Sequence, residues 1–468
     1  MLHRNKFKIL LPIENIAREF DYKLILSSYL LERDYEIIIA QHDLLFSISK
    51  FIKNGVYIGK NTMTRLNNGK WFSDRHHKIK ANNISIFHLD EEGAVYYGRE
   101  EDWVKKISEL RVDKHAFDEN DFVLTWGNFQ ANVFKENTSA YSNKIFCTGH
   151  PKFDLLKKKY SFFYEADVRR IKNEFENYIL VNTNFAHFNN SLGNKDSLSP
   201  RMGYKVDNDD ERITSINQWS YVGKTFLDFI KLITSLSIEF SDKHFVIRPH
   251  PSESLEIYNK IFDDVKNVTI KRDGSVIPWI LASDIVIHDG CTTALEAYFA
   301  TKPIINYHPH HEEKTNLYLP NKVGIKCHDI ASVKEAINNK ENLLQNSNYR
   351  RLEEDTLSMS LVKNISNFED SFHQIKNLIH AEIDKNSQSR VQNFQLKFFM
   401  TFSSAINFLK LIFRPLFSEK QKDYLAYKAI FPGFDKKLVK HKISLLNKHS
   451  NNIDIKFLSD QIIILNKK

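Results

Sequence analysis

Three adjacent carboxylates, Asp90, Glu91 and Glu92, occupy the segment HLDEEGAVYYG, which runs from residue 88 to residue 98. Acidic runs usually lie on solvated faces, and a surface loop is the alternative here. Apolar residues flank this run on both sides, which favours a turn between buried elements. A carboxylate held in such a turn can act as a general base toward a hydroxyl group. The segment therefore predicts a catalytic acidic loop.

The segment RPHPSES brings charged residues and helix-starting residues together. Arg248 and His250 come at the end of the apolar run HFVI, and Pro251 and Ser252 then suit the first turn of a helix. A helix start presents unpaired backbone N–H groups and a partial positive charge, and both suit a phosphate group. Arg248 and His250 would add charge-assisted hydrogen bonds to that phosphate.

The segment HDGCTTALEA repeats this arrangement after the run DIVI. Gly290 permits close approach of the backbone to a ligand, and Thr292 and Thr293 supply hydroxyl groups at the expected helix start, with Glu296 in the same segment. Two phosphate-binding helix starts predict a nucleotide site, although the threonines would also serve as a simple cap. The chain has no GxxxxGK(S/T) motif and no convincing GxGxxG motif, which disfavours ATP hydrolysis and dinucleotide redox chemistry.

Two amides and one histidine complete the candidate residues. Asn182 and Asn184 follow the run YILV and are predicted to line the donor or acceptor cleft, with a role as turn residues as the alternative. His150 precedes a proline in TGHPKFDLL and is predicted to lie at a hinge between domains.

These segments all follow short apolar runs that are typical of parallel strands, and helical stretches separate the runs. The alternation predicts an α/β fold, in which ligands bind beyond the carboxyl ends of the strands. The expected strands are 6–13, 35–40, 84–89, 121–127 and 144–149 in the first part of the chain, and 178–184, 244–250, 283–289 and 303–309 in the second.

A chain of 468 residues is too long for one ordinary core. We expect an N-terminal Rossmann-like domain at 1–155 and a C-terminal Rossmann-like, nucleotide-binding domain at 156–385, which face a central cleft. Residues 386–468 form a basic, amphipathic C-terminal extension.

The positive charge of the chain belongs to that extension. It holds 15 Lys and Arg against 5 Asp and Glu, so the remainder is slightly acidic although the whole chain carries +8. This distribution disfavours a nucleic-acid binder. Within 394–417, bulky apolar residues recur every three or four positions opposite basic ones, which predicts contact with an anionic membrane surface or packing on protein.

Location and metal content are predicted from absences in the sequence. The three cysteines, Cys147, Cys291 and Cys327, lack metal-ligand spacing, which fits a reducing compartment and no structural metal. The apolar run near the N-terminus is too short for a signal peptide, and no stretch of about 20 residues is free of charge. We therefore expect a cytoplasmic protein.

The order of these motifs resembles a family of surface carbohydrate biosynthesis proteins and is similar to retaining Kdo transferase modules. The matching pieces are HLDEEG, TGHPKFDLL, ILVNTNF, RPHPSE, DGCTTALEAYFATKPIINY and LYLPN, which span about residues 6–325. Bacterial sialyltransferases and other enzymes that use CMP-activated sugars also carry an acidic pair before glycine and a His-Pro pair. That resemblance assigns the base to Glu91, with Asp90 and Glu92 as alternates, and the contact with the CMP phosphate to His250.

The resemblance implies a GT-B fold and a glycosyltransferase of capsule or lipopolysaccharide synthesis. The enzyme would transfer Kdo or a related nonulosonic acid from a CMP-sugar to a glycan or lipid-linked acceptor, peripherally on the inner face of the cytoplasmic membrane. We expect no cofactor beyond the CMP-sugar co-substrate, and no metal, because the leaving group carries one phosphate. The alternatives are a transferase that uses a UDP-sugar or a CDP-polyol, a nucleotide-sugar epimerase and a non-catalytic assembly scaffold.

Overall fold

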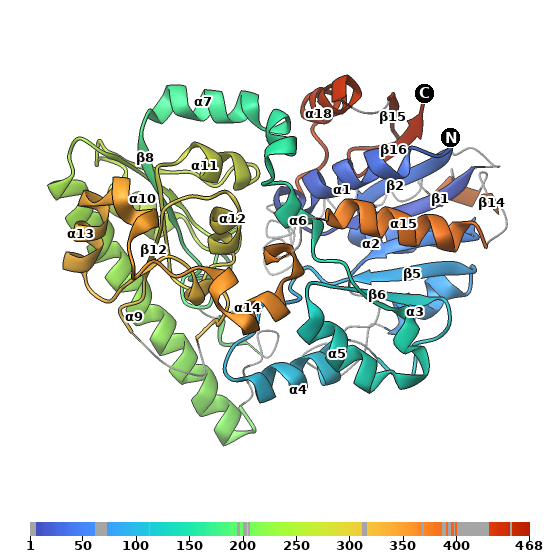
Figure 1. Cartoon of the computed structure of the whole chain (residues 1–468), viewed down its shortest axis with the longest axis horizontal. Helices are drawn as coiled ribbons and strands as arrows, with labels where there is room; N and C mark the ends of the chain where they lie inside the picture. Colours follow the sequence, from blue (N-terminus) through green and yellow to red (C-terminus); the bar gives the residue numbers. More distant parts are fainter. Residues whose placement is uncertain are drawn as a thin grey trace, which may run out of the picture. The chain divides into compact units, whose positions relative to one another are not determined.

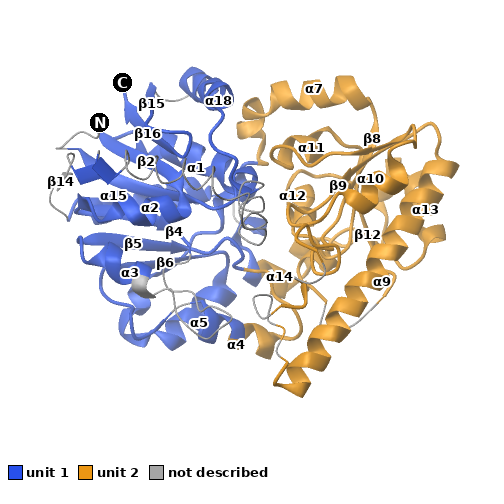
Figure 2. Cartoon of the chain, turned by 180° about the vertical axis from the view of Figure 1, so that it is seen from behind, with its two compact units in different colours: residues 1–93, 106–155, 360–468 blue, residues 94–105, 156–359 orange. Residues whose placement is uncertain are grey.

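The computed structural model (Figure 1) describes most of the chain. The described residues are 6–60, 73–111, 113–193, 197–199, 204, 206–310, 316–366, 369–385, 390–391, 395–396, 398–399, 430–449 and 452–468. The chain divides into two compact units (Figure 2). Unit 1 comprises 1–93, 106–155 and 360–468, and unit 2 comprises 94–105 and 156–359.

This division differs from the expected domains in two places. Residues 94–105 belong to unit 2, and residues 360–385 belong to unit 1, as does the whole C-terminal part. The helix α15 (Ser371–Ile383) shows why, because it packs beside α1 (Ile16–Leu30) of unit 1. Tyr29 of α1 stacks on Phe372 of α15 with ring centroids 5.6 Å apart.

Unit 1 is built on an eight-stranded sheet whose order is β15-β16-β2-β1-β4-β5-β6-β7. The six strands from β2 to β7 in this order run parallel. They are β1 (Phe7–Ile13), β2 (Tyr35–Gln41), β4 (Gly55–Gly59), β5 (Ile84–Leu89), β6 (Asp121–Thr125) and β7 (Ile145–Cys147). The continuous apolar runs form these strands because a parallel sheet is covered on both faces.

The helices of unit 1 follow the strands as the alternating pattern predicts. Besides α1 and α15 they are α2 (His42–Ser49), α3 (Ser73–Lys80), α5 (Asn128–Asn137), α6 (Pro151–Asp154) and α18 (Lys436–His449); α4 (Glu100–Leu110) spans residues of both units. The short strands β3 (Ile52–Lys53) and β14 (Arg390–Val391) form a separate antiparallel pair.

A C-terminal hairpin extends the first sheet, which the sequence analysis did not predict. β15 (Ile453–Phe457) pairs antiparallel with β16 (Ile462–Lys467), and β16 pairs antiparallel with β2. Ile463 and Leu465 are fully buried. The apolar run IIIL therefore covers the edge of β2, which would otherwise present unpaired backbone groups.

The expected amphipathic helix at 394–417 lies largely outside the described residues, which include only 395–396 and 398–399 of it. Leu396 is buried, and Phe399 packs against a core cluster of unit 1, whereas Phe398 is 67% exposed. Within the described residues, no helix is both long enough and apolar enough to cross a membrane.

Unit 2 contains a six-stranded sheet in which all the strands run parallel, in the order β10-β9-β8-β11-β12-β13. The strands are β8 (Tyr178–Asn182), β9 (His244–Arg248), β10 (Val268–Ile270), β11 (Ile285–His288), β12 (Ile304–Tyr307) and β13 (Ile325–Cys327). Counted along the chain, this order is that of the Rossmann fold, and the strand order reverses between β8 and β11.

The helices of unit 2 include the 31-residue α9, which Figure 1 shows as the longest helix drawn. This helix spans Asp209–Glu239. The other helices are α7 (Glu165–Phe175), α10 (Glu256–Phe262), α11 (Ile277–Ala282), α12 (Thr293–Phe299), α13 (Ile330–Asn338) and α14 (Thr356–Leu361). The prediction of an α/β fold with two Rossmann-like sheets is confirmed.

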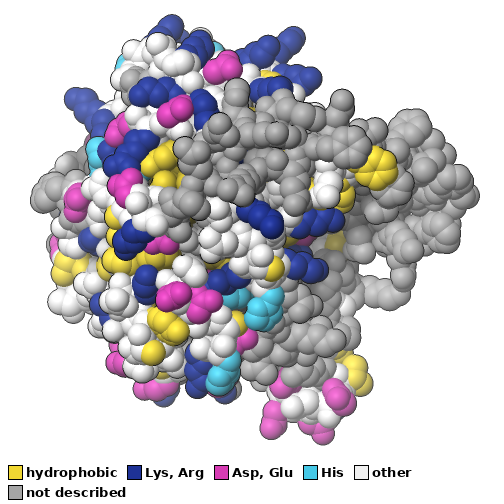
Figure 3. Space-filling model, turned by 90° about the vertical axis from the view of Figure 1, so that its right-hand side faces the viewer, with side chains coloured by type: hydrophobic (Ala, Val, Ile, Leu, Met, Phe, Trp, Pro, Cys, Tyr) yellow, Lys and Arg dark blue, Asp and Glu magenta, His cyan; other side chains and the backbone are white. Residues whose placement is uncertain are grey.

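Charged side chains are mixed on the surface drawn in Figure 3. Among the coloured residues of that face, Lys and Arg lie dispersed between Asp, Glu and uncharged side chains.

The C-terminal hairpin should contribute directly to the stability of unit 1. Leu465 is 0% exposed and pairs with Ile37 of β2. We expect Leu465→Ala to lower the free energy of unfolding by about 2–5 kcal/mol, because it leaves a cavity in the core. Leu438→Ala is the matched control, since Leu438 in α18 is 45% exposed, and it should change stability by about 0.5 kcal/mol or less. Urea denaturation measures both, and equal effects would contradict the interpretation.

Candidate active site

The acidic loop begins where β5 ends, at the carboxyl edge of the sheet of unit 1. Trp126, which follows β6, holds it: the indole Nε1 donates a hydrogen bond to the carbonyl of Asp90 at 2.6 Å. The same ring explains Gly93, because a Cβ atom there would lie 2.4 Å from the indole. The glycine of the acidic motif is therefore required by the close approach of Trp126.

Glu91 is the most enclosed of the three acids, with 5% of the residue exposed. The Tyr22 hydroxyl donates to Glu91 Oε1, and Lys23 Nζ lies 3.5 Å from the same oxygen. His150 Nε2 lies 3.5 Å from the other oxygen, Oε2. The helix α1 thus supplies two partners of Glu91, and the residue that caps α6 supplies the third.

A chain of alternating charges extends from this carboxylate toward the surface, where Glu14 is exposed. Lys23 Nζ lies 2.6 Å from Glu19, and Lys60 Nζ lies 2.6 Å from Glu14 and 3.9 Å from Glu19. Burial alone would raise the pKa of Glu91, but Lys23, His150 and Lys60 outweigh it and hold this pKa well below that of an ordinary glutamate. Glu91 is therefore ionised at neutral pH.

Asp90 and Glu92 are more exposed than Glu91 and share one partner. Arg111 lies 3.5 Å from a carboxylate oxygen of each, and the side chain of Glu92 is 46% exposed. Burial opposes the ionisation of Glu92, but Arg111 and Lys60 outweigh it and lower its pKa to about 2. All of these acids lie in unit 1.

His150 lies in unit 1, near the boundary after residue 155 between the two units. The residue is fully buried, and its ring Nδ1 accepts a hydrogen bond from the backbone N–H of Lys152 at 3.2 Å. The backbone N–H of His150 donates to Asn364 Oδ1 at 2.9 Å. Burial lowers the pKa of His150 despite the nearby Glu91 carboxylate. The sequence analysis missed Tyr22, Lys23 and His150 as partners of Glu91, because they are distant in the chain.

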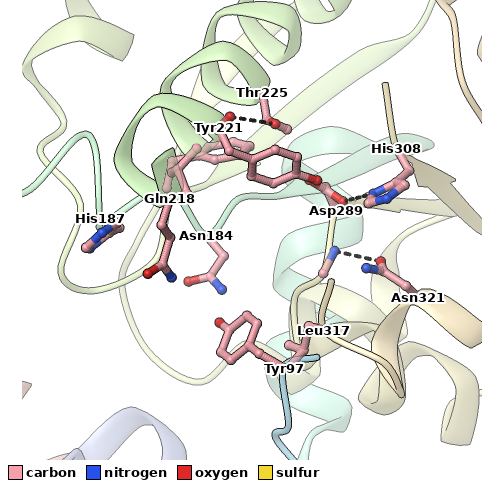
Figure 4. A pocket seen from close by; sticks show the side chains of 13 residues that line it. Tyr97, Asn184, His187, Gln218, Tyr221, Thr225, Asp289, His308, Leu317 and Asn321 are labelled. Carbon is pink, nitrogen blue, oxygen red and sulfur yellow. Dashed lines mark hydrogen bonds and ion pairs between the residues drawn. The ribbon is translucent and has the colours of Figure 1, made fainter. Parts of the chain in front are cut away.

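An open pocket of about 660 Å³ lies in unit 2 at the point where the strand order reverses. Figure 4 shows that Asn184, after β8, and Asp289, after β11, approach it together with residues of α9. The lining residues are Tyr97, Asn184, Phe185, His187, Gln218, Tyr221, Val222, Thr225, Asp289, Gly290, His308, Leu317 and Asn321.

Two hydrogen bonds fix the side of this pocket formed by β11 and β12. Asp289 Oδ1 lies 2.7 Å from His308 Nδ1, and Gly290 donates its N–H to Asn321 Oδ1 at 3.0 Å. Gly290 has a φ of +55°, a left-handed conformation that favours glycine. Among the residues that the structure describes, the lining holds hydroxyl, amide and imidazole groups and one carboxylate, and no Lys or Arg. Such a lining suits the hydroxyl-rich or heterocyclic part of a ligand better than a phosphate group.

The segment that contains Arg248 and His250 differs from the expectation. α10 begins only at Glu256, so the predicted helix start at Pro251 and Ser252 is wrong. The two residues form a turn instead, in which Ser252 donates its N–H to His250 Nδ1 at 3.2 Å. The turn forms because Glu253 is fully buried and accepts the N–H of His250 at 2.9 Å, which ends the extended chain there.

The guanidinium of Arg248 is committed to the protein. It donates to the carbonyls of Asp273 and Gly274 at 3.1 and 3.2 Å and lies over the Trp279 ring. Burial lowers the pKa of Arg248 to about 10. Arg248 therefore anchors the turn at 273–274.

The predicted nucleotide-binding residues Thr292 and Thr293 have different surroundings at the start of α12. Thr292 precedes this helix without a capping hydrogen bond from its side chain, and the Thr293 hydroxyl contacts Cys291 Sγ at 3.1 Å. Of the predicted nucleotide-binding and cleft residues, Asn184 and Gly290 line the pocket. The residues outside its lining are Asn182, Arg248, His250, Pro251, Ser252, Thr292, Thr293 and Glu296.

Among the described residues, one group has ligand atoms close enough to hold a metal ion: His76, His88 and Asp121, all buried. The two Nε2 atoms lie 2.9 and 3.0 Å from Asp121 Oδ1, which are hydrogen-bond distances. Lys80 Nζ lies 2.8 Å from Asp121 Oδ2 and already neutralises the carboxylate. We interpret the group as an anchor that ties α3 to β5 and β6, two residues before the acidic loop.

Comparisons with known proteins assign no family. No family model matches the chain, and no curated protein matches it. The chain is similar to a solved structure of the wall teichoic acid polymerase TagF, with 11% identity over 81% of this chain and 89% of that one and a TM-score of 0.48. It is also similar to the UDP-GlcNAc 2-epimerase of Methanocaldococcus jannaschii in complex with UDP-GlcNAc and UDP, with 14% identity over 80% and 99% of the two chains and a TM-score of 0.45.

A third similar structure is S. aureus MnaA with UDP, with 13% identity over 81% of this chain and 97% of that one and a TM-score of 0.45. At these identities and TM-scores the likenesses carry no conclusion about activity.

The network around Glu91 predicts a specific dependence of stability on pH. Because the pKa of folded Glu91 is depressed, its ionisation stabilises the folded chain above the pKa of an unfolded glutamate, about 4.3. This stabilisation is lost as pH falls below that value toward the folded pKa. We expect Glu91→Gln to lower the free energy of unfolding by about 1.5–3 kcal/mol near neutral pH. The difference from wild type should shrink as the pH falls below about 4.

Urea denaturation across this pH range measures the effect. Glu109→Gln is the matched control, because Glu109 is an exposed acid of the same unit. Its effect should stay within about 0.5 kcal/mol at every pH. A destabilisation by Glu91→Gln that is equally large in acid would contradict the ion-pair interpretation.

Proposed function

We propose that this chain is a glycosyltransferase that transfers Kdo or a related nonulosonic acid from a CMP-sugar to a glycan acceptor. The observation that carries the proposal is the polar pocket at the strand-order reversal of unit 2, where α/β proteins of this topology bind nucleotides. The acidic loop of unit 1 supplies the second requirement, a carboxylate that is ionised at neutral pH. The motif resemblance supplies the donor class.

The donor pocket would bind the sugar or the nucleoside through neutral groups. Asn184 and Gln218 offer amides, Tyr97 and Tyr221 offer rings that can stack on a flat ligand, and Asp289 can accept hydrogen bonds from hydroxyl groups. The hydrogen bond that His308 Nδ1 donates to Asp289 Oδ1 holds that carboxylate in place.

The proposed reaction forms a bond between an acceptor oxygen and the anomeric carbon of the donor sugar. It breaks the bond between that carbon and a phosphate oxygen, so the bonding electrons leave with CMP. The acceptor hydroxyl gives its proton to a carboxylate of the acidic loop. Glu91 is the first candidate, with Asp90 and Glu92 as alternates. In a retaining enzyme the carboxylate would instead attack the anomeric carbon first.

The low pKa of Glu91 limits its strength as the proposed base. A general base works best when its pKa lies near the working pH, so a strongly depressed pKa weakens proton removal. The Tyr22 hydroxyl and Lys23 already bind one Glu91 oxygen. Glu91 would therefore act best if the acceptor hydroxyl replaces one of these partners. Glu92 is more exposed, but Arg111 contacts its carboxylate and its pKa is lowered to about 2, so the same limit applies to it.

His250 is the proposed contact of the leaving phosphate. Its Nδ1 accepts the Ser252 N–H, so in the neutral ring the proton is on Nε2, which would donate to a phosphate oxygen. Arg248 acts as a positioning residue, since its guanidinium holds the turn at 273–274. Thr292 and Thr293 would contribute hydroxyl groups near the start of α12.

We further propose a lipid-linked acceptor at the inner face of the cytoplasmic membrane, in capsule or lipopolysaccharide synthesis. The segment 394–417 is the proposed membrane contact. The burial of Leu396 and the packing of Phe399 on unit 1 favour packing on protein for its described residues.

A donor assay tests the reaction. We expect the purified full chain to release CMP from CMP-Kdo in the presence of acceptor glycan, also in EDTA, because we propose no metal or further cofactor. CMP at about 100 times its Kd should add about 2.7 kcal/mol of stability. Release from UDP-GlcNAc or CDP-glycerol alone would contradict the CMP assignment and favour the other transferases, and interconversion of UDP-sugars without acceptor would favour an epimerase.

Substitution of the acidic loop separates an enzyme from a scaffold. We expect Glu91→Gln to lower the transfer rate by about 10²–10⁴-fold if Glu91 is the base or nucleophile. Glu109→Gln should retain full activity, since Glu109 is exposed and outside the loop. Unchanged surface glycan in cells that carry Glu91→Gln or His250→Ala would favour the scaffold. Asp90→Asn and Glu92→Gln identify the base if Glu91→Gln remains active.

A further inference from the structure

A second hollow in unit 2 differs in chemistry from the donor pocket. It is an open groove of about 1280 Å³ beside β13 and the loop 347–351. We call it the basic groove. Its lining residues are Lys322, Lys326, His328, Ser347, Asn348, Tyr349, Arg350, Arg351, Glu354 and Asp355.

The two acids of the basic groove are engaged within the protein. Glu354 lies 3.6 Å from Arg351, and Asp355 accepts the hydroxyl groups of Tyr318 and Ser358 at 2.9 and 2.6 Å. Within the described part of the chain, the structure shows no ion pair within 4.0 Å for Lys322, Lys326 or Arg350. The groove therefore gathers positive charge in excess of its local acids.

These cations repel one another at close range. Burial lowers the pKa of Lys326, Arg350 and Lys322 lower it further, and Asp289 opposes this shift. Like charges that lie close together destabilise a fold, and a bound anion relieves this repulsion. The arrangement is therefore costly for the protein alone and favourable for a bound anion.

Rigid elements hold the cations in place. Arg350 exchanges two backbone hydrogen bonds with Gly324, at 3.0 and 3.2 Å, next to β13. Gly324 has a φ of +83°, and a Cβ atom there would lie 2.5 Å from the carbonyl oxygen of Ile304. Lys322 lies over the Tyr318 ring at 4.8 Å, and His328 Nδ1 lies 2.9 Å from the carbonyl oxygen of His308. The backbone that carries these side chains is thus fixed by the sheet.

We propose that the basic groove binds a ligand that bears negatively charged phosphate, such as a diphosphate or a phosphodiester. Arg and Lys make charge-assisted hydrogen bonds to phosphate oxygens. Lys and Arg side chains line the basic groove, whereas none lines the donor pocket among the described residues. This site does not depend on the proposed transferase activity, because it uses residues of neither the donor pocket nor the acidic loop.

Calorimetric titration of the full chain with inorganic pyrophosphate tests the proposal. We expect binding that weakens as salt increases, and about a tenfold or greater loss of affinity in Lys326→Gln and in Lys322→Gln. Lys334→Gln is the matched control, because Lys334 in α13 pairs with Glu239 and lies outside the groove. It should bind pyrophosphate as the wild type does.

Titration with CMP in parallel shows that each variant retains its folded donor pocket. Absence of pyrophosphate binding by the wild type, or equal affinity in the groove variants and in Lys334→Gln, would overturn the proposal. Pyrophosphate binding without CMP binding would support the groove and contradict the proposed donor instead.

Lipid headgroups also carry negatively charged phosphate. A vesicle-binding experiment distinguishes this source from a soluble phosphate ligand. The wild type and the double variant Lys322→Gln/Lys326→Gln are sedimented with vesicles of phosphatidylglycerol and of phosphatidylcholine. Loss of binding to phosphatidylglycerol vesicles in the double variant would assign the groove to a lipid headgroup. Unchanged vesicle binding, together with weakened pyrophosphate binding, would assign it to a soluble or glycan-borne phosphate.

Discussion

The parallel direction of the strands is the constraint on which the candidate chemistry depends. In each unit it places the loops that follow the strands at one edge of the sheet, so residues far apart in the chain meet there. The acidic loop after β5 meets α1 and the N-terminal cap of α6, and Asn184 after β8 meets Asp289 after β11. The order of the strands therefore decides which of the polar segments become neighbours.

In the acidic loop, the contacts that keep a buried carboxylate ionised also make it a weaker base. Tyr22, Lys23 and His150 keep Glu91 ionised in a buried place, where an unpaired carboxylate would be costly. The same partners lower its basicity and occupy its oxygens. In unit 2 the charged groups lie in different places: Asp289 and uncharged polar groups line the donor pocket among the described residues, and the cations of the basic groove lie beside β13.

The sequence predicted the sheets well and the site only in part. Continuous apolar runs such as FKILLPI, YILVN and IVIH predict buried parallel strands, and the carboxyl-end rule correctly selected the segments of Asn184 and Gly290. It failed at Pro251 and Ser252, because a buried Glu253 that accepts the His250 N–H favours a turn over a helix start. Tyr22, His308 and the contact of His150 with Glu91 escaped prediction, because they depend on contacts that no local pattern encodes.

The C-terminal hairpin gives the chain an order of assembly. The edge of β2, which ends at Gln41, is covered only by β16, which begins at Ile462. During synthesis this edge leaves the ribosome long before its covering strand exists, and all of unit 2 is made in between. The nascent chain therefore carries an open β-edge through most of translation, which exposes it to wrong pairing with neighbouring chains and to chaperones that recognise extended backbone.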